Sequence, residues 1–284
     1  MAEMYSRGTE NGTLPYTSAM NMRAFLAQRS IFSLDDFARS FPDLSLIAAK
    51  KQLLRAKGRG EVKPVGRGLY AVVPGGQSPD THRPDPFLLL HARIPDAVFC
   101  GHSALELNGL AYSVWNQVTA YTTGNRASFR REGTKYRLLQ TPKMLVGENA
   151  NLGLKTIDRN GTMIQTLGPE RTLVEGFRSP KDFGGLSEFL SSVEHLERVK
   201  ETLLLELLSS FGEKKLYACL GWFLESHKAN LDVSDLFLTT CHENQPKAPV
   251  YLARKMGQVQ KVLGWNLLMP EQLLHMEDQG APEF

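Results

Sequence analysis

Residues 32–39 read Phe-Ser-Leu-Asp-Asp-Phe-Ala-Arg, residues 44–55 read Leu-Ser-Leu-Ile-Ala-Ala-Lys-Lys-Gln-Leu-Leu-Arg, and residues 62–73 read Val-Lys-Pro-Val-Gly-Arg-Gly-Leu-Tyr-Ala-Val-Val. The first two stretches have helical spacing of apolar residues, and the third has two strand-forming runs around a glycine turn. Two helices joined by a short turn and followed by a hairpin form a winged helix-turn-helix, whose second helix can enter a DNA major groove. The sequence therefore predicts this motif over residues 21–74.

Local signals set the boundaries of the two predicted helices. Ser33 is placed to cap the first helix, with Asp36 three residues later as in a capping box. Phe41-Pro42 ends that helix, because the residue before a proline is pushed out of the helical region. Asp43 or Ser45 can cap the second helix, which we expect from about residue 46 to 57.

The second helix is expected to bury one side and present the other to DNA. Leu46, Ala49, Leu53 and Leu54 are assigned to the buried side, and Lys50 lies too near that stripe to be counted as a contact. Lys63 and Arg67 lie on the predicted wing. The predicted DNA-binding residues are Ser45, Ala48, Lys51, Gln52, Arg55, Arg59, Lys63 and Arg67.

Positive charge is concentrated in this motif. From Met22 to Tyr70 there are ten Lys or Arg residues and four acids, a net charge of +6, whereas the whole chain carries +3. Attraction to phosphate would therefore be local to the motif. Charged helix faces are often only solvated, and winged helices also bind proteins, so a protein-interaction module remains the alternative.

Composition indicates a globular protein of ordinary size. The chain has 284 residues, of which 42% are hydrophobic and 22% charged, which fits two domains. It has neither an uncharged run of about 18 apolar residues nor an apolar block within residues 1–20, so we expect no membrane contact and a cytoplasmic location. Cys100, Cys219 and Cys241 are odd in number and widely spaced, which predicts reduced, mostly buried thiols.

The predicted fold class is α+β, with the winged helix followed by a larger mixed α/β domain. We expect residues 1–20 to be a flexible lead, residues 75–86 to be a linker rich in proline and glycine, and residues 87–284 to form the larger domain. Its strands are expected at 117–122, 136–140, 152–157 and 162–166, and its helices at 87–92, 102–108, 170–177, 188–211 and 214–226.

No catalytic constellation is complete in the larger domain. Cys-Gly-His-Ser-Ala-Leu at 100–105 lacks the second glycine of a nucleophile elbow, so we expect His102 or Ser103 to cap the following helix instead. Cys241-His242 has no second pair at a zinc-finger spacing. The sequence therefore predicts no catalytic residue, no metal and no cofactor, and we do not expect an enzyme.

Three blocks together resemble the abortive-infection E antitoxins, AbiEi, of type IV toxin–antitoxin systems. They are Gly66-Arg67-Gly68-Leu69-Tyr70, then Gly101-His102-Ser103-Ala104-Leu105 with Gly109-Leu110, then Pro169-Glu170-Arg171-Thr172-Leu173-Val174-Glu175. The similarity extends from about residue 22 to residue 200. For the last block the residues themselves predict an Arg171–Glu175 pair one helical turn apart, with Leu173 and Val174 facing inward.

The resemblance implies a bacterial antitoxin that represses its own operon. Its winged helix would bind inverted repeats in the promoter, as a dimer or as monomers loading cooperatively, and its C-terminal domain would counteract a nucleotidyltransferase-like toxin by direct contact or at the toxin's target. Two other readings stay open. One is a winged-helix transcription factor whose larger domain senses a ligand, and the other is an enzyme with an unrecognised site.

Overall fold

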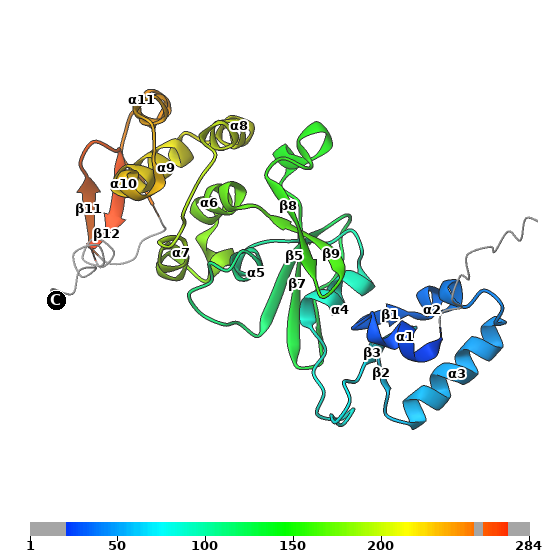
Figure 1. Ribbon diagram of the computed structural model, residues 1–284. Helices are drawn as coiled ribbons and strands as arrows, with labels where there is room; N and C mark the ends of the chain where they lie inside the picture. The colour runs from blue at the N-terminus through cyan, green and yellow to red at the C-terminus, as the bar shows by residue number, and fades with distance from the viewer. Residues whose placement is uncertain (1–20, 253–257, 272–284) are drawn as a thin grey trace, which may run out of the picture.

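The computed structural model describes residues 21–252 and 258–271, and its parts follow one another along a bent axis (Figure 1). An N-terminal unit, a central sheet and a set of C-terminal helices are visible, so the predicted α+β class is confirmed. The predicted lead at residues 1–20 lies outside the described residues. None of the helices within the described ranges is long and apolar enough to cross a membrane.

The N-terminal unit combines three helices with a small antiparallel sheet. Its elements are α1 (Met22–Ala27), β1 (Ile31–Ser33), α2 (Leu34–Ser40), α3 (Leu46–Gly58), β2 (Val62–Gly66) and β3 (Leu69–Val72), and its strand order is β1-β3-β2. Phe25, Phe32 and Phe37 form the centre of its core, against which α3 packs through Ala49 and Leu53. Helices α2 and α3 and the β2–β3 hairpin lie where the sequence predicted them, whereas β1 was not predicted.

Both helix caps expected near the turn are present. Ser33 Oγ accepts a hydrogen bond of 3.0 Å from the Asp36 backbone, and Asp36 Oδ2 accepts one of 2.9 Å from the Ser33 backbone. The pair is therefore the capping box that the sequence predicted. Of the two cap candidates for α3, the structure selects Ser45, whose hydroxyl accepts from Ala48 N at 3.2 Å.

Replacing Ser33 by Ala is expected to lower the free energy of unfolding by about 1 kcal/mol, because two backbone N–H groups of α2 lose part of their reciprocal cap. Burial raises the pKa of Asp36, but hydrogen bonds from Ser33 and Arg39 outweigh it and hold that pKa below its ordinary value. A lowered folded-state pKa contributes stability above the ordinary pKa, and the contribution is lost as the pH falls through the lowered value.

The difference in unfolding free energy between wild type and Ser33→Ala should therefore become smaller in acid. Urea titrations of wild type and Ser33→Ala at neutral pH and near pH 3 measure it. Ser33→Thr keeps the hydroxyl and serves as the control, which we expect to unfold close to wild type. An Ala variant as stable as wild type at neutral pH would contradict the assigned cap.

A mixed six-stranded sheet forms the centre of the molecule. Its order is β6-β7-β5-β4-β9-β8, and only the β5–β7 and β4–β9 pairs are parallel. All four predicted strands are present, whereas β4 and β6 were not predicted. The strands are β4 (Val98–Phe99), β5 (Gln117–Thr122), β6 (Phe129–Arg131), β7 (Thr134–Gln140), β8 (Leu154–Arg159) and β9 (Thr162–Leu167).

Helices cover both faces of this sheet. On one face α4 (Pro86–Arg93) packs on strand residues that include Phe99, and on the other lie α5 (His102–Leu107) and α6 (Pro169–Arg178). The core under α4 also contains Val65 and Leu69 of the N-terminal unit. Residues 75–86, predicted as a linker, therefore connect two units that pack directly against each other.

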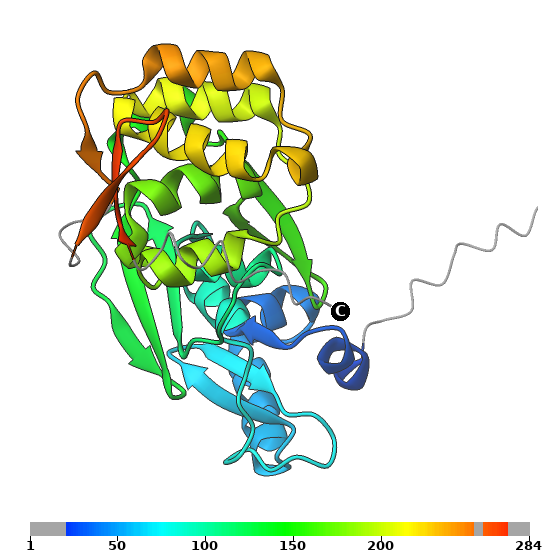
Figure 2. The ribbon, with the colours of Figure 1, turned by 90° about the vertical axis from the view of Figure 1, so that its left-hand side faces the viewer.

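The remaining helices and a three-stranded sheet complete the C-terminal part. Figure 2 shows the helices of residues 201–244 at the end of the molecule opposite the N-terminal unit. Its elements are α7 (Leu186–Val193), α8 (Glu201–Phe211), α9 (Lys214–Ser226), α10 (Lys228–Leu231), α11 (Asp235–Asn244), β10 (Val250–Tyr251), β11 (Val259–Val262) and β12 (Leu267–Pro270). Short 3-10 turns lie at Lys143–Leu145, Gly147–Asn149 and Pro180–Phe183.

Two sequence predictions for this part have different outcomes. The single helix expected over residues 188–211 is wrong, because the chain leaves the helix after Val193 and begins α8 at Glu201. The prediction of reduced, buried thiols is confirmed, since Cys100, Cys219 and Cys241 are all free and buried. Burial raises the pKa of Cys219 and of Cys241 to about 12.

Candidate nucleic-acid interface

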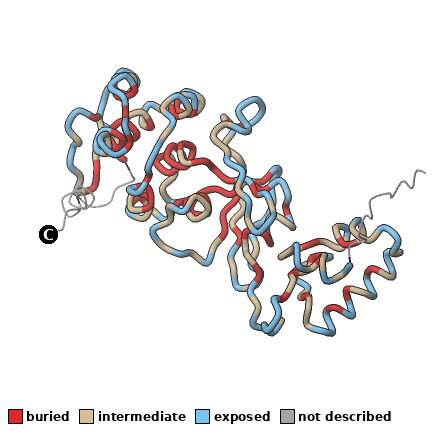
Figure 3. The backbone as a smooth tube through the Cα atoms, in the orientation of Figure 1, coloured by how far each residue is buried: buried red, intermediate tan, exposed pale blue. Residues whose placement is uncertain are grey.

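The solvent side of α3 is the candidate interface. Ala49, Leu53 and Ala56 are buried against the N-terminal core, while the other side of the helix faces outward. In Figure 1, α3 lies along the edge of the N-terminal unit on the side away from the central sheet. Figure 3 shows buried residues alternating with exposed ones along it, as an amphipathic surface helix requires. Thus the helix is open to a large partner.

This side of α3 carries positive charge without compensating acids. Lys50, Lys51, Arg55 and Lys57 are all exposed, and α3 itself contains no Asp or Glu. Within residues 21–252 and 258–271, no ion pair involves any of these four cations. A positive face of this kind attracts polyanions at long range and is weakened by salt.

The predicted contact residues of α3 fall into two groups. Lys51 and Arg55 are exposed, whereas Ala48 and Gln52 are half-buried at the border with the core. Ser45 is exposed at the start of the helix, but its hydroxyl is engaged in the cap. Lys51 and Arg55 are therefore free to meet a phosphate or a base edge, and Ser45, Ala48 and Gln52 lie beside them.

Arg67 and Arg59 differ in whether their guanidinium groups are available to a ligand. Arg67 is exposed in the turn between β2 and β3, where Gly68 adopts a φ of 69° that favours glycine. Arg59 donates two hydrogen bonds of 2.8 Å to the carboxylate of Glu61. The guanidinium of Arg59 holds the pKa of Glu61 below its ordinary value. Arg67 is thus available to a ligand, while Arg59 is already compensated by a neighbouring acid.

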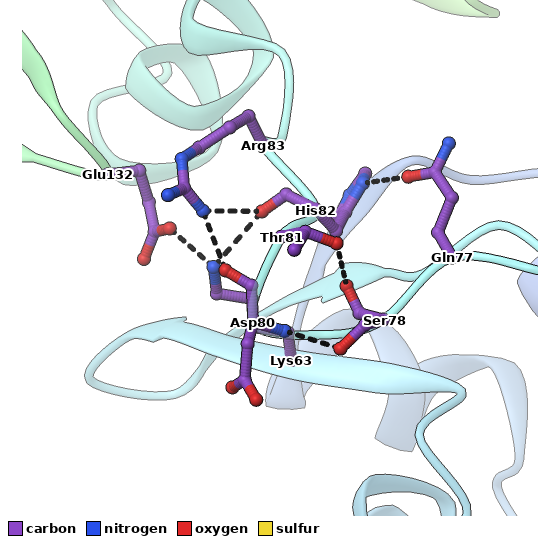
Figure 4. A network of polar contacts seen from close by, with 8 residues as sticks. All are labelled: Lys63, Gln77, Ser78, Asp80, Thr81, His82, Arg83 and Glu132. Atoms are coloured by element: carbon purple, nitrogen blue, oxygen red, sulfur yellow. Dashed lines mark hydrogen bonds and ion pairs between the residues drawn. The ribbon is translucent and has the colours of Figure 1, made fainter.

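Lys63 is engaged inside the protein rather than presented on a free wing (Figure 4). Its Nζ lies 2.5 Å from Glu132 Oε2 and donates to the His82 carbonyl at 3.2 Å, and the two charged side chains are only 16% and 18% exposed. His82 is held in turn by Gln77, at 3.0 Å. We therefore correct the sequence prediction: Lys63 joins β2 to the β6–β7 turn and is removed from the contact set.

The apolar residues of α3 also differ from the prediction. Leu46 and Leu54 were assigned to the buried side, but their exposed fractions are 51% and 67%, and Ile47 reaches 69%. The buried stripe instead follows Ala49, Leu53 and Ala56, which share one face at the spacing i, i+4, i+7. That spacing was present in the sequence, but Leu46 and Leu54 supplied a second apolar stripe with helical spacing.

The block at residues 101–105 has a structural role. Gly101 precedes α5 with a φ of 59°, and a Cβ there would lie 2.4 Å from the Asp182 carbonyl oxygen. Ser103 Oγ accepts from Thr119 N at 2.9 Å, and the His102 ring stacks on Trp115 at 4.2 Å. Neither side chain caps α5, so the predicted cap by His102 or Ser103 is wrong.

Burial lowers the pKa of His102, although its contact with Glu188 opposes that effect.

A small polar cavity lies between the sheet and α6. It has a volume of only about 10 Å³ and is lined by Cys100, Tyr121, Glu175 and Asp182 among others. Ligand pockets typically measure roughly 300–1,000 Å³ and are mostly apolar. In the described residues, no three His, Cys, Asp or Glu side chains lie together as a metal site would require. We therefore place the candidate site on α3.

Comparisons with known proteins supply a fold and no family. No family model matches the chain, and no curated protein matches it. The chain shares its fold with the RV2827C protein of Mycobacterium tuberculosis. The crystal structure of that protein superposes with a TM-score of 0.58, covering 89% of this chain and 90% of the other at 16% sequence identity. At this sequence identity the similarity indicates a shared fold and nothing about function.

Proposed function

We propose that this chain is a DNA-binding antitoxin and transcriptional autorepressor of a type IV toxin–antitoxin operon. The observation that carries the DNA-binding half is the outward face of α3, on which Lys50, Lys51, Arg55 and Lys57 have no acidic partner among residues 21–252 and 258–271. The order of helices and strands in the N-terminal unit supports reading it as a winged helix, with α3 as the helix that enters the major groove.

Repression by this route requires occupancy of the promoter and no chemical step. The cations of α3 and Arg67 on the turn of the hairpin would neutralise phosphates and fix the position of the protein on the duplex. Side chains of α3 that reach base edges, with Arg55 and Gln52 as the polar candidates, would select the sequence. No catalytic residue and no cofactor enters this proposal.

The antitoxin half rests on the resemblance of the three sequence blocks. The second and third blocks lie in α5 and α6 on one face of the central sheet, away from α3. We therefore propose that the part of the chain after residue 86 counteracts a nucleotidyltransferase-like toxin, separately from DNA binding. Co-expression with a nucleotidyltransferase-like toxin from the proposed operon tests this half, because a variant that no longer binds DNA should still restore growth.

Fluorescence-anisotropy titration tests the DNA-binding half. The protein is titrated against the duplex upstream of its own coding region and against a scrambled duplex, over a salt series. Five cations without an ion-pair partner in the described part of the chain, namely the four on α3 and Arg67, predict a slope of about −4 to −5 in log affinity against log salt if all contact phosphate. Equal, weak binding to both duplexes would instead make the N-terminal unit a protein-interaction module.

The double substitution Lys51→Ala/Arg55→Ala is expected to reduce the salt slope by about 2 if both side chains contact phosphate. If Arg55 contacts a base instead, the slope should fall by about 1 and operator binding should weaken by about 1–3 kcal/mol more. Lys181→Ala/Arg198→Ala is the matched control, because it removes two exposed cations beyond the central sheet and changes the net charge equally. An unchanged slope in the α3 variant, or an equal loss in the control, would show that α3 is not the interface.

A further inference from the structure

Two large aliphatic side chains lie within the positive face of α3. Ile47 and Leu54 have exposed fractions of 69% and 67%, although each has a branched apolar side chain that folding would normally bury. They stand seven residues apart and therefore on nearly the same side of the helix, about 10 Å apart along its axis. Nothing within the described chain covers them.

The lysines between them define the environment of these two side chains. Lys50 and Lys51 follow Ile47 by three and four residues and precede Leu54 by four and three, so both are surface neighbours of each aliphatic group. Neither lysine has an ion-pair partner among the described residues. A partner for this surface must therefore supply dense negative charge and, beside it, small apolar groups.

The major groove of DNA meets both requirements. Phosphates line its edges, and the C5-methyl group of thymine is the apolar group that its base pairs present there. Another copy of this chain, docked face to face, would bring the four exposed cations of α3 against four more, which opposes self-association through α3.

We propose that Ile47 and Leu54 read thymine methyl groups, so that this protein selects sites by apolar contact as well as by hydrogen bonds. This inference rests on the proposed DNA-binding function and deepens it. Ile47 lies in the first turn of α3, where recognition helices contact base edges, and is the principal reader. Leu54 reads a second thymine on the order of three base pairs away, at about 3.4 Å per pair.

Replacing thymine by deoxyuridine tests the inference directly, because the substitution removes the methyl group and keeps the hydrogen-bonding groups. Single deoxyuridines are placed at each thymine of the protected part of the upstream duplex, and affinity is measured by anisotropy with wild type, Ile47→Ala and Leu54→Ala. Wild type should lose about fourfold in affinity at each methyl that is contacted. Each Ala variant should become insensitive at its own thymine and stay sensitive at the other.

The control variant is Met163→Ala, which truncates a side chain that is 64% exposed on the central sheet. It should bind every duplex as wild type does. Both α3 positions are exposed and Ala favours helix, so the variants should fold, which circular dichroism checks.

Three outcomes would overturn the inference. The first is that wild type binds the fully deoxyuridine-substituted duplex as tightly as the thymine duplex, and the second is that Ile47→Ala and Leu54→Ala keep every sensitivity. In both cases the preference for the upstream duplex over the scrambled one persists, and the proposed function stands. Failure of the proposed function looks different, because that preference and its salt dependence are then absent. A change in sedimentation of Ile47→Ala without DNA, with unaltered methyl sensitivity, would assign the surface to self-association.

Discussion

Replacing Glu175 by Gln is expected to lower the free energy of unfolding by about 3–5 kcal/mol. Arg171 Nε lies 2.7 Å from Glu175 Oε1, and the two side chains are 1% and 4% exposed. The neutral amide would leave the guanidinium charge of Arg171 buried without a counter-ion, and solvent cannot reach it to compensate. The i, i+4 pair that the sequence predicted is thus confirmed, and its burial makes it sensitive to the loss of one partner.

The surrounding hydrogen bonds make the fold depend further on Glu175. Tyr121 Oη donates to Glu175 Oε2, and Arg171 Nη1 donates to the Leu152 carbonyl at 2.9 Å. Burial, together with the nearby Cys100 and Glu175, raises the pKa of Tyr121, so its hydroxyl stays protonated and able to donate. The network joins β5, α6 and the segment before β8. Glu175→Gln should therefore destabilise all three segments together.

Urea titrations of single and double variants measure the effect. Arg171→Met/Glu175→Leu removes both charges and keeps side-chain bulk, and it should unfold closer to wild type than Glu175→Gln does, because no unpaired charge remains. Glu188→Gln, which changes a carboxylate on α7, provides a comparison outside this ion pair. A Glu175→Gln protein within 1 kcal/mol of wild type would show that the pair adds little.

Local chemistry made much of the N-terminal unit predictable. Ser33 and Asp36 satisfy each other's backbone groups within one turn, and Phe41-Pro42 ends α2 by a steric clash between adjacent residues. Such signals act over a few residues and need no tertiary context. Pro169 at the first position of α6 is another case, and it placed that helix correctly.

The faces of α3 were less predictable because apolar residues lie around most of its circumference. A stripe through Leu46 and Leu54 and one through Ala49, Leu53 and Ala56 are both compatible with helical spacing. In the structure, the stripe through Ala49, Leu53 and Ala56 packs on the aromatic core that contains Phe25 and Phe37. Which apolar stripe is buried therefore depends on how the helix meets this core, and the local spacing alone does not decide it.

Contacts distant in sequence account for the other differences. Lys63 meets Glu132 across 69 positions, and no local pattern shows that pairing. Similarly, the break between α7 and α8 contains neither glycine nor proline. There the Lys200 backbone N–H donates to Glu170 Oε1 at 2.9 Å, so a residue of another helix accepts the donor just before α8 begins.

Trp265 shows how the part of the chain after residue 200, which lies outside the sequence resemblance, is attached to the rest. Its side chain is 1% exposed, its Nε1 donates to Glu225 Oε2 at 2.7 Å, and its ring stacks on His242 at 3.8 Å. The ring approaches α9 at Gly221, where a Cβ would lie 2.1 Å from Trp265 Cη2. The glycine therefore makes room for the indole, and the indole fixes the sheet of β10, β11 and β12 to the helices.

Replacing Trp265 by Ala is expected to cost about 3–5 kcal/mol, because it leaves a large cavity and removes the partner of Glu225. Gly221→Ala alone should cost about 1–3 kcal/mol through steric overlap with the indole. The two effects should not add. Once Trp265 is truncated the overlap disappears, and the added methyl fills part of the cavity and favours the helix. The double variant should then be at least as stable as Trp265→Ala, as measured by urea unfolding. Additive losses would mean that the indole does not occupy the space above Gly221.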